Sequence, residues 1–255
     1  MRLPFINVKN IIPFCFFIVM TFFAPRISQG QELTFAVSHW PPYSICEQDT
    51  PCSGIDVEIV KEIAKRLNTQ LKIEKCPWKR CLYIMEKGEA DIISSLLRVP
   101  DREVYMRFIE PPYRPGVSKV FYLKKGSRHL IQKYEDLHKL KIGTILGSKY
   151  FSRFDNDSKI RKIEVAKEYQ LLELLKAGRI DAFINDEQQA DYLIFTKGYQ
   201  GQFDKASFRS EKGVAYLAIS KKSKFANQLS IFNNIIAQMK SEGKVKEILN
   251  MYFKK

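Results

Sequence analysis

The stretch MEKGEADIISS, residues 85–95, contains the end of a helix, a turn, a strand and a polar strand end. Gly88 within it suits the left-handed conformation that closes many helices. A similar stretch, LKAGRIDAF, occupies residues 175–183 and runs into Asn185 and Asp186. Ligands of open α/β sheets bind outside the carboxyl ends of the strands. The repeat therefore predicts two similar lobes that present polar strand ends to a shared cleft.

Alternating strands and helices precede this stretch. Residues 33–37, 71–75 and 90–94 are predicted as strands, and residues 54–68 and 80–87 as helices. In the segment 54–68 the apolar residues recur at helical spacing. An acid lies in its first turn and two basic residues lie in its last, as the helix dipole favours. This βαβ order predicts parallel strands whose faces are covered by helices.

The chain is predicted to cross twice between the lobes. One crossing is the strand at 120–123, which follows a proline-rich stretch, and the other is the strand at 214–219. Helical patterns at 225–239 and 245–252 return the chain to the first lobe. We therefore expect the first lobe to contain residues 31–119 and 214–255 and the second to contain residues 120–213. Two crossing strands make a hinge that can open and close.

Residues 1–30 have the layout of a secretory signal peptide. Arg2 and Lys9 precede an apolar run from Ile11 to Pro25, and small residues precede a cut near Gly30 and Gln31. The run is shorter than the ~20 apolar residues that a membrane span needs. The mature protein is expected to be exported to the periplasm, and an uncleaved membrane anchor is the alternative.

The cysteines are consistent with export. Cys15 lies in the signal peptide, and the mature chain keeps Cys46, Cys52, Cys76 and Cys81. An even number in an oxidising compartment favours disulfides, with three possible connectivities. Short loops favour Cys46–Cys52 and Cys76–Cys81, and free or buried thiols are the alternative. A zinc site is disfavoured because the sequence has no C-x-x-C and its histidines lack ligand spacing.

The positive charge of the chain is spread along its length. Lys and Arg number 42 against 28 Asp and Glu, a formal net charge of +14, and 45% of the residues are hydrophobic. This is the composition of a globular protein. Nucleic-acid binding is disfavoured, because the basic residues are not interleaved with aromatic ones and export removes the usual partners. The charge suits an anionic solute or the cell envelope, or serves solubility.

Several motifs, taken in their order and spacing, resemble the family 3 extracellular solute-binding proteins, the periplasmic receptors that deliver polar amino acids to ABC importers. The motifs are GIDVEI at 54–59, GEADIISS at 88–95, PDR at 100–102, GTILGS at 143–148, GRID at 178–181 and KSEG at 240–243. The resemblance covers nearly all of residues 33–253. It implies an α/β, type II periplasmic binding protein-like fold, with two lobes, a hinge of two crossing strands and a ligand cleft between the lobes.

The resemblance also implies site residues in the first lobe. An arginine at the position of Arg102 grips the ligand carboxylate, a role that suits a guanidinium fork. Arg98, four residues earlier, is a second candidate. Ser94 and Ser95 match positions that offer backbone and hydroxyl groups, although Leu97 replaces a polar residue often found nearby. The alternatives are that Arg102 pairs with a surface acid such as Asp101, that Arg98 is a solvated loop residue, and that the serines only cap the strand.

Other implied site residues lie on both sides of the cleft. Trp40 and Trp78 fall in predicted loops and match the aromatic positions that sandwich the ligand, and the alternative is that they fill the core. Ser148 and Lys149 are expected at the start of a helix, where free N–H groups bind an anion, although Lys149 replaces a small hydroxyl residue. Asp186 matches the acid that receives the α-amino group of the ligand, and the alternative is a helix N-cap.

The expected function is capture of a small polar solute, an amino acid or a related carboxylate, by lobe closure, followed by delivery to the membrane permease of an ABC importer. The protein is expected to be a monomer that uses no cofactor and no metal. One alternative is a periplasmic sensory module. The other is a small lyase or dehydratase on the same scaffold, with Asp186 or Glu187 as the acid–base group.

Overall fold

The computed structural model describes residues 31–47 and 49–253. They belong to one compact unit, Gln31–Lys255. The predicted signal peptide, residues 1–30, lies outside the described residues. Within the described residues, we find no helix with the length and apolar character needed to cross a membrane.

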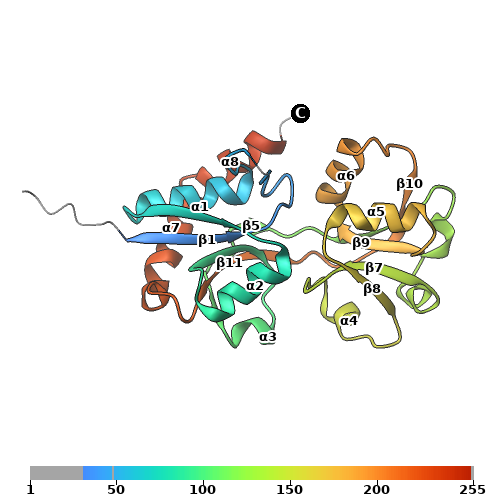
Figure 1. The fold of residues 1–255 in the computed structure, drawn as a ribbon, viewed down its shortest axis with the longest axis horizontal. Helices are drawn as coiled ribbons and strands as arrows, with labels where there is room; N and C mark the ends of the chain where they lie inside the picture. The colour runs from blue at the N-terminus through green and yellow to red at the C-terminus, as the bar shows by residue number, and fades with distance from the viewer. Residues whose placement is uncertain (1–30, 48, 254–255) are drawn as a thin grey trace, which may run out of the picture. The chain divides into compact units, whose positions relative to one another are not determined.

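The first sheet has the strand order β2-β1-β3-β11-β4, with the short strand β5 beside β11 (Figure 1). Its parallel part consists of β2 (Gln70–Lys75), β1 (Glu32–Val37) and β3 (Ile92–Leu96). The strand β11 (Val214–Ser220) is antiparallel to β3, to β4 (Met106–Phe108) and to β5 (Arg114–Pro115). The parallel part confirms the βαβ order predicted for the N-terminal segment.

Helices cover both faces of the first sheet, because successive side chains of a strand point to opposite faces. Leu33, Phe35 and Val37 of β1 pack in one core cluster with α1 (Ile55–Arg66), α7 (Leu229–Ser241) and α8 (Lys244–Phe253). Ala36 faces the other way and packs with α2 (Trp78–Lys87). The C-terminal helices therefore return to the first sheet, as the sequence predicts.

The second sheet has the order β10-β6-β9-β7-β8. Its parallel strands are β7 (Lys141–Ile145), β8 (Arg161–Val165) and β9 (Ala182–Asp186), while β6 (Lys119–Lys124) is antiparallel to β9 and to β10 (Phe203–Arg209). The helices α5 (Glu168–Lys176) and α6 (Glu187–Thr196) cover one face. The other face is covered by η2 (Tyr134–Lys139) and α4 (Ser152–Asp155). Short helical turns complete the chain at α3 (Pro100–Glu103), η1 (Arg128–Leu130) and η3 (Ala226–Gln228).

The repeated Gly-x-x-Asp pattern has the same structural role in both sheets. Gly88 and Gly178 adopt positive φ angles of 80° and 67° just after α2 and α5. The carboxylate of Asp91 then accepts a hydrogen bond from the backbone N–H of Thr34 in β1, at 2.8 Å. Asp181 accepts the equivalent bond from Lys141 in β7, at 2.7 Å. Each aspartate thus ties the start of its own strand, β3 or β9, to the parallel strand beside it, β1 or β7.

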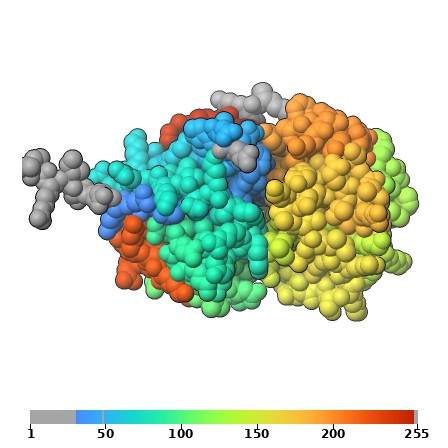
Figure 2. Space-filling view, in the orientation of Figure 1, coloured from blue at the N-terminus to red at the C-terminus, as the bar shows by residue number. Residues whose placement is uncertain are grey.

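Two connections join the sheets: residues 116–118 lead from β5 to β6, and residues 210–213 lead from β10 to β11. They touch at Gly116, where an added Cβ would lie 1.1 Å from the carbonyl oxygen of Gly213. We call the part of the protein built on the first sheet lobe 1 and the part built on the second sheet lobe 2. The strands fall on the two sides of the predicted boundaries, except that β6 begins one residue early, and the exact boundaries stay a prediction. Figure 2 shows the two lobes meeting along one face of the molecule.

Two disulfides close short loops in lobe 1. Cys46 is bonded to Cys52, and Cys76 is bonded to Cys81. This is the connectivity that the sequence favours. The first disulfide follows the loop that carries Trp40, and the second spans the start of α2, which carries Trp78. The second disulfide therefore encloses Trp78, whereas Trp40 lies outside the ring closed by the first.

Candidate functional site

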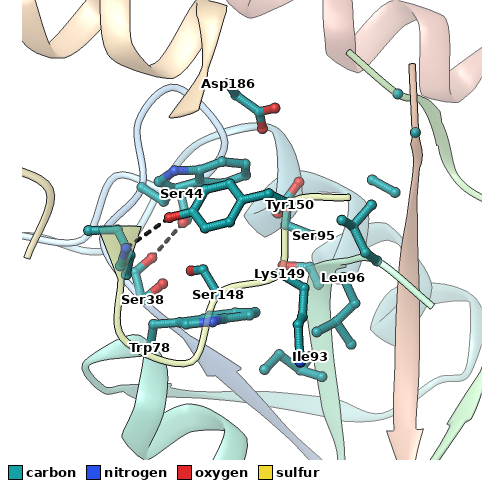
Figure 3. Close-up of a pocket in the computed structure, with 18 of the residues that line it drawn as sticks. Ser38, Ser44, Trp78, Ile93, Ser95, Leu96, Ser148, Lys149, Tyr150 and Asp186 are labelled. Carbon is teal, nitrogen blue, oxygen red and sulfur yellow. Dashed lines mark hydrogen bonds between the residues drawn. The ribbon is translucent and has the colours of Figure 1, made fainter. Parts of the chain in front are cut away.

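A cavity of about 90 Å³ lies between the lobes, which is room for a small molecule and not only for a single water. It is lined from both sides, as Figure 3 shows for Trp78, Ser95 and Leu96 on lobe 1 and for Ser148, Tyr150 and Asp186 on lobe 2. Lobe 1 also contributes Trp40, Ser94, Arg102 and Arg114. Lobe 2 also contributes Lys119, Lys149 and Glu168. The carboxyl ends of β1, β3, β7 and β9 all contribute lining residues, as predicted, and loops, helices and the connections between the lobes contribute the others.

Arg102 is buried in α3, with only 4% of its surface exposed, and it lines the cavity. Its guanidinium donates to the carbonyl oxygen of Leu97 at 3.0 Å and to that of Gly147, on lobe 2, at 3.3 Å. Within the described residues it forms no ion pair with a carboxylate. Burial lowers the pKa of Arg102 to about 10, so the side chain stays protonated at neutral pH. The site therefore holds a desolvated positive charge.

Both tryptophans line the cavity, as the resemblance implies. Trp78 does not lie in a loop as predicted, because α2 begins at this residue and not at Arg80. Its indole Nε1 donates to the carbonyl oxygen of Gly147 at 3.3 Å, and the guanidinium of Arg102 lies 5.6 Å from its ring centre. Trp40 stacks on Tyr43 with ring centres 4.5 Å apart. The two indoles form apolar walls next to charged groups.

The two serines at the end of β3 have different environments. Ser94 is buried beside the cavity, and within the described residues its hydroxyl has no hydrogen-bond partner. The hydroxyl of Ser95 donates to Asp56 at 2.6 Å and accepts from Arg114 at 3.0 Å. Tyr113 also donates to Asp56, at 2.6 Å. The Ser95 hydroxyl is therefore already used by a buried network, while the Ser94 hydroxyl is free for a solute.

Asp186 lines the cavity from the end of β9 and is paired with Lys119. It is only 1% exposed, and Lys119 Nζ donates to its Oδ1 at 2.7 Å. Asp186 occupies the N-cap position of α6, yet its side chain makes no capping hydrogen bond. Asp186 is therefore the N-cap residue of α6 by position, but its carboxylate pairs with Lys119 and does not cap the helix.

Ser148 and Lys149 lie in a turn and not at the start of a helix. The helix α4 begins only at Ser152 and has four residues. The N–H of Ser148 donates to the carbonyl oxygen of Ile145 at 2.9 Å, which closes the turn. Both residues line the cavity, but the predicted helix N-terminus is wrong, because Gly147 turns the chain at a φ of 79° before any helix forms.

Arg98 does not line the cavity. Its Nε donates to Glu103 at 2.5 Å and its Nη1 donates to Glu110 at 2.8 Å, with about half of the side chain exposed. The short helix α3 begins at Pro100, so Arg98 precedes the helix that positions Arg102. The four-residue spacing therefore does not place the two arginines on one helix face, and the surface alternative describes Arg98.

The lining residues that the sequence analysis does not name as site residues include Arg114, Lys119, Tyr150 and Glu168. Arg114 follows the proline-rich stretch and lies 4.1 Å from the ring centre of Tyr43. The hydroxyl of Tyr150 accepts from the N–H of Ile145 at 2.8 Å. Arg114 and Lys119 could have been predicted from the sequence, because both are charged residues beside a predicted crossing between the lobes. Glu168 lies in the first turn of α5, where an acid also serves the helix dipole.

Two further contacts bridge the lobes. The hydroxyl of Tyr43 donates to the side chain of Gln188 at 2.7 Å. Lys149 Nζ lies 3.4 Å from a carboxylate oxygen of Asp101. Trp78 and Arg102 of lobe 1 also donate hydrogen bonds to the carbonyl oxygen of Gly147 on lobe 2. The lobes are therefore joined by direct contacts between protein groups.

Of the two acid–base candidates of the enzyme alternative, Asp186 lines the cavity and is paired with Lys119, whereas Glu187 lies away from the cavity. Glu187 forms ion pairs with Lys205 and Arg209. The hydrogen bond from Arg209 is the main cause that lowers the pKa of Glu187 to about 2. Glu187 does not line the cavity. Within the described residues we also find no group of His, Cys, Asp and Glu arranged to hold a metal ion.

Comparison with known proteins agrees with this arrangement. The L-cystine-binding protein TcyJ of Escherichia coli (strain K12) is 24% identical over 233 residues, which cover 88% of this chain and 83% of that protein. The histidine-binding periplasmic protein of the same strain is 26% identical over 237 residues, covering 89% and 87%. A mutant of ArgBP from T. maritima matches with a TM-score of 0.76 at 22% identity, covering 89% of this chain and 97% of that one. The model of the bacterial extracellular solute-binding proteins, family 3, matches residues 33–255, and the chain therefore belongs to this family.

Proposed function

We propose that this protein captures a small carboxylate-bearing solute between its lobes in the periplasm and delivers it to the permease of an ABC importer. The observation that carries the proposal is the guanidinium of Arg102, which is buried at the cavity and bonded only to carbonyl oxygens within the described residues. A buried charge is costly unless it is paired. A solute carboxylate supplies the missing negative charge through two parallel hydrogen bonds.

The cavity also offers surfaces for the rest of the solute. Trp40 and Trp78 provide large rigid faces, and Ser94 and Ser148 provide hydroxyl groups. The names of the relatives specify cystine and histidine, which supports amino acids as a ligand class, and the proposal extends this class to related carboxylates. A solute that touches both lobes stabilises the closed arrangement by its differential affinity for that state. Closure then presents one bound shape to a permease.

A melting-shift screen of the mature protein against amino acids, hydroxy acids, keto acids and dicarboxylates tests the proposal. A ligand at 100 times its Kd stabilises the folded state by about 2.7 kcal/mol. Hydrogen bonds to charged groups contribute about 1.5–3 kcal/mol. Since 1.4 kcal/mol corresponds to a tenfold change, Arg102→Met is expected to weaken binding about 10- to 100-fold in calorimetry.

Arg98→Met is the matched control, because Arg98 lies four residues before Arg102, pairs with surface acids and does not line the cavity. It is expected to bind the solute with unchanged affinity. Cells that lack the protein are expected to lose uptake of the solute that the screen identifies. Wild-type affinity in Arg102→Met, or a flat response to every carboxylate, would contradict the proposal.

A further inference from the structure

Asp186, the most deeply buried acid of lobe 2 at the cavity, already has a cationic partner within the chain. Lys119 and Asp186 lie directly opposite each other in the antiparallel ladder of β6 and β9. The ammonium of Lys119 donates to Asp186 at 2.7 Å, and the two side chains are 15% and 2% exposed. Because the strand register sets this pairing, the fold itself delivers the ammonium to the carboxylate.

A second cation lines the same cavity. It is Arg114, which is 5% exposed. Burial opposes its charge, but neighbouring groups that include Asp56 and Asp186 raise the pKa of Arg114 above its usual value. A cationic group of a solute that approached Asp186 would therefore meet Lys119 and Arg114. Like charges in one poorly hydrated site disfavour each other.

The other two acids of the cavity do not replace Asp186. Both carboxylate oxygens of Asp56 accept hydrogen bonds, from the hydroxyls of Ser95 and Tyr113. Glu168 follows β8, whereas Asp186 ends β9, and β7 with its turn lies between these two strands. Burial raises the pKa of Glu168 to about 7, so a large part of it is protonated at neutral pH.

We propose that Lys119 is a selectivity residue: it fills the place at Asp186 that an ammonium group of a solute would otherwise take. The cavity then selects carboxylates that lack an α-ammonium group, such as α-hydroxy, α-keto and unsubstituted acids. This inference rests on the proposed function, in which Arg102 holds the carboxylate of the solute. It separates this protein from relatives whose names specify amino acids.

The first test uses the wild-type protein and matched acids. Each set shares one side chain and differs only at the α-carbon, which carries an amino group, a hydroxyl group or hydrogen. Calorimetry at pH 7.5 is expected to show the hydroxy or unsubstituted acid binding at least about tenfold more tightly than the amino acid. An amino acid that binds equally well or more tightly overturns the inference but leaves the proposed function standing. A flat response to all sets overturns the proposed function and the inference with it.

The second test removes the internal ammonium. Lys119→Met exposes Asp186 to the solute, and the preference is expected to move toward the amino acid by at least about tenfold. In Lys119→Met combined with Asp186→Asn no carboxylate is uncovered, so the preference for the acid without an ammonium group is expected to persist. An unchanged preference in Lys119→Met, or a double variant that prefers the amino acid, contradicts the role of Lys119.

Lys149→Met is the matched control. Lys149 also lines the cavity, but it lies near Asp101, which is an exposed acid. Its replacement removes a positive charge without uncovering a buried carboxylate, so the ratio of affinities is expected to stay unchanged. An equal shift in Lys149→Met would show a general charge effect and overturn the inference. If Lys119→Met does not fold, the inference is still tested by the ratio of affinities in the wild-type protein and in the double variant of Lys119→Met with Asp186→Asn. The double variant leaves no unpaired charge at these two positions.

Discussion

Glu168 lines the cavity from the first turn of α5, and burial raises the pKa of its carboxyl from 4.5 to about 7. Below about pH 4.5 the group is protonated in both the folded and the unfolded chain. Between the two values the folded chain keeps a proton that the unfolded chain has released. The free energy of unfolding therefore falls as pH rises through this window, and it is constant again above about pH 7.

The size of this effect is set by the shift in pKa. One pKa unit corresponds to about 1.4 kcal/mol, so the loss between pH 4.5 and 7.5 approaches about 3 kcal/mol. Glu168→Gln keeps the shape of the side chain without the charge, and it is expected to remove this loss and to be the more stable protein at pH 7.5. Urea unfolding at pH 4.5, 6 and 7.5 measures it. Glu164→Gln, at an exposed position on β8, is the control and should keep the wild-type slope.

Single residues show how far the sequence predicts the site. Arg102 and Trp78 are predicted from positions that match the family pattern, and both line the cavity, while their contact with a solute stays a prediction. Lys119 was missed because its importance comes from the register of β6 against β9, which joins residues far apart in the chain. Arg98 was placed wrongly because α3 begins after it. Local spacing predicts residues within one element, whereas pairs across elements depend on tertiary structure.

The two connections between the lobes, residues 116–118 and 210–213, pass so close to each other that Gly116 has no room for a side chain. A Cβ at Gly116 would lie 1.1 Å from the oxygen and 1.8 Å from the carbon of the Gly213 carbonyl, so the two connections would have to separate. A Cβ at Gly213 would meet only the end of the Leu97 side chain, at 3.1 Å. The two glycines touch each other, yet only one of them requires the absence of a side chain.

Gly116→Ala is therefore expected to lower the free energy of unfolding by about 2 kcal/mol or more, in the upper part of the range for overpacking. Gly213→Ala is expected to cost less than about 1 kcal/mol, because a flexible side chain can move aside. Urea unfolding of the two variants measures the difference. Equal losses would mean that the connections are not in contact at Gly116 in solution.

Secondary structure was easier to predict than its connections. β1 and β2 begin within one residue of their predicted positions. The apolar run of β1 and the alternation of apolar and polar side chains in β2 both leave a clear pattern in the sequence. The sequence analysis assigns Trp78 to a loop and therefore misses the start of α2 at this residue. The preceding Pro77 could have indicated it, because proline commonly flanks a helix start. The helix expected at Ser148 and Lys149 begins only at Ser152. The turn at Gly147 comes between β7 and this helix, and the spacing of apolar residues does not reveal such a turn.

At the scale of the whole molecule, direct contacts between the lobes set the balance between closed and open states. The bond from Tyr43 to Gln188 is one of these contacts, and neither residue lines the cavity. Gln188 is exposed on α6, so its replacement leaves the core intact. The apparent affinity for a solute falls with the fraction of the protein that can close around it. A contact that bridges the lobes therefore contributes to affinity without touching the solute.

Gln188→Ala tests this coupling. A hydrogen bond contributes about 0.5–1.5 kcal/mol net, so the affinity for every bound solute is expected to fall about 2- to 10-fold. The ratio of affinities between solutes should not change, because the cavity is unaltered, and scattering should show a larger radius of gyration without solute. Gln238→Ala, at an exposed position on α7, is the control and should leave affinity and shape unchanged. A change in selectivity in Gln188→Ala would mean that Gln188 acts on the cavity itself and not through closure.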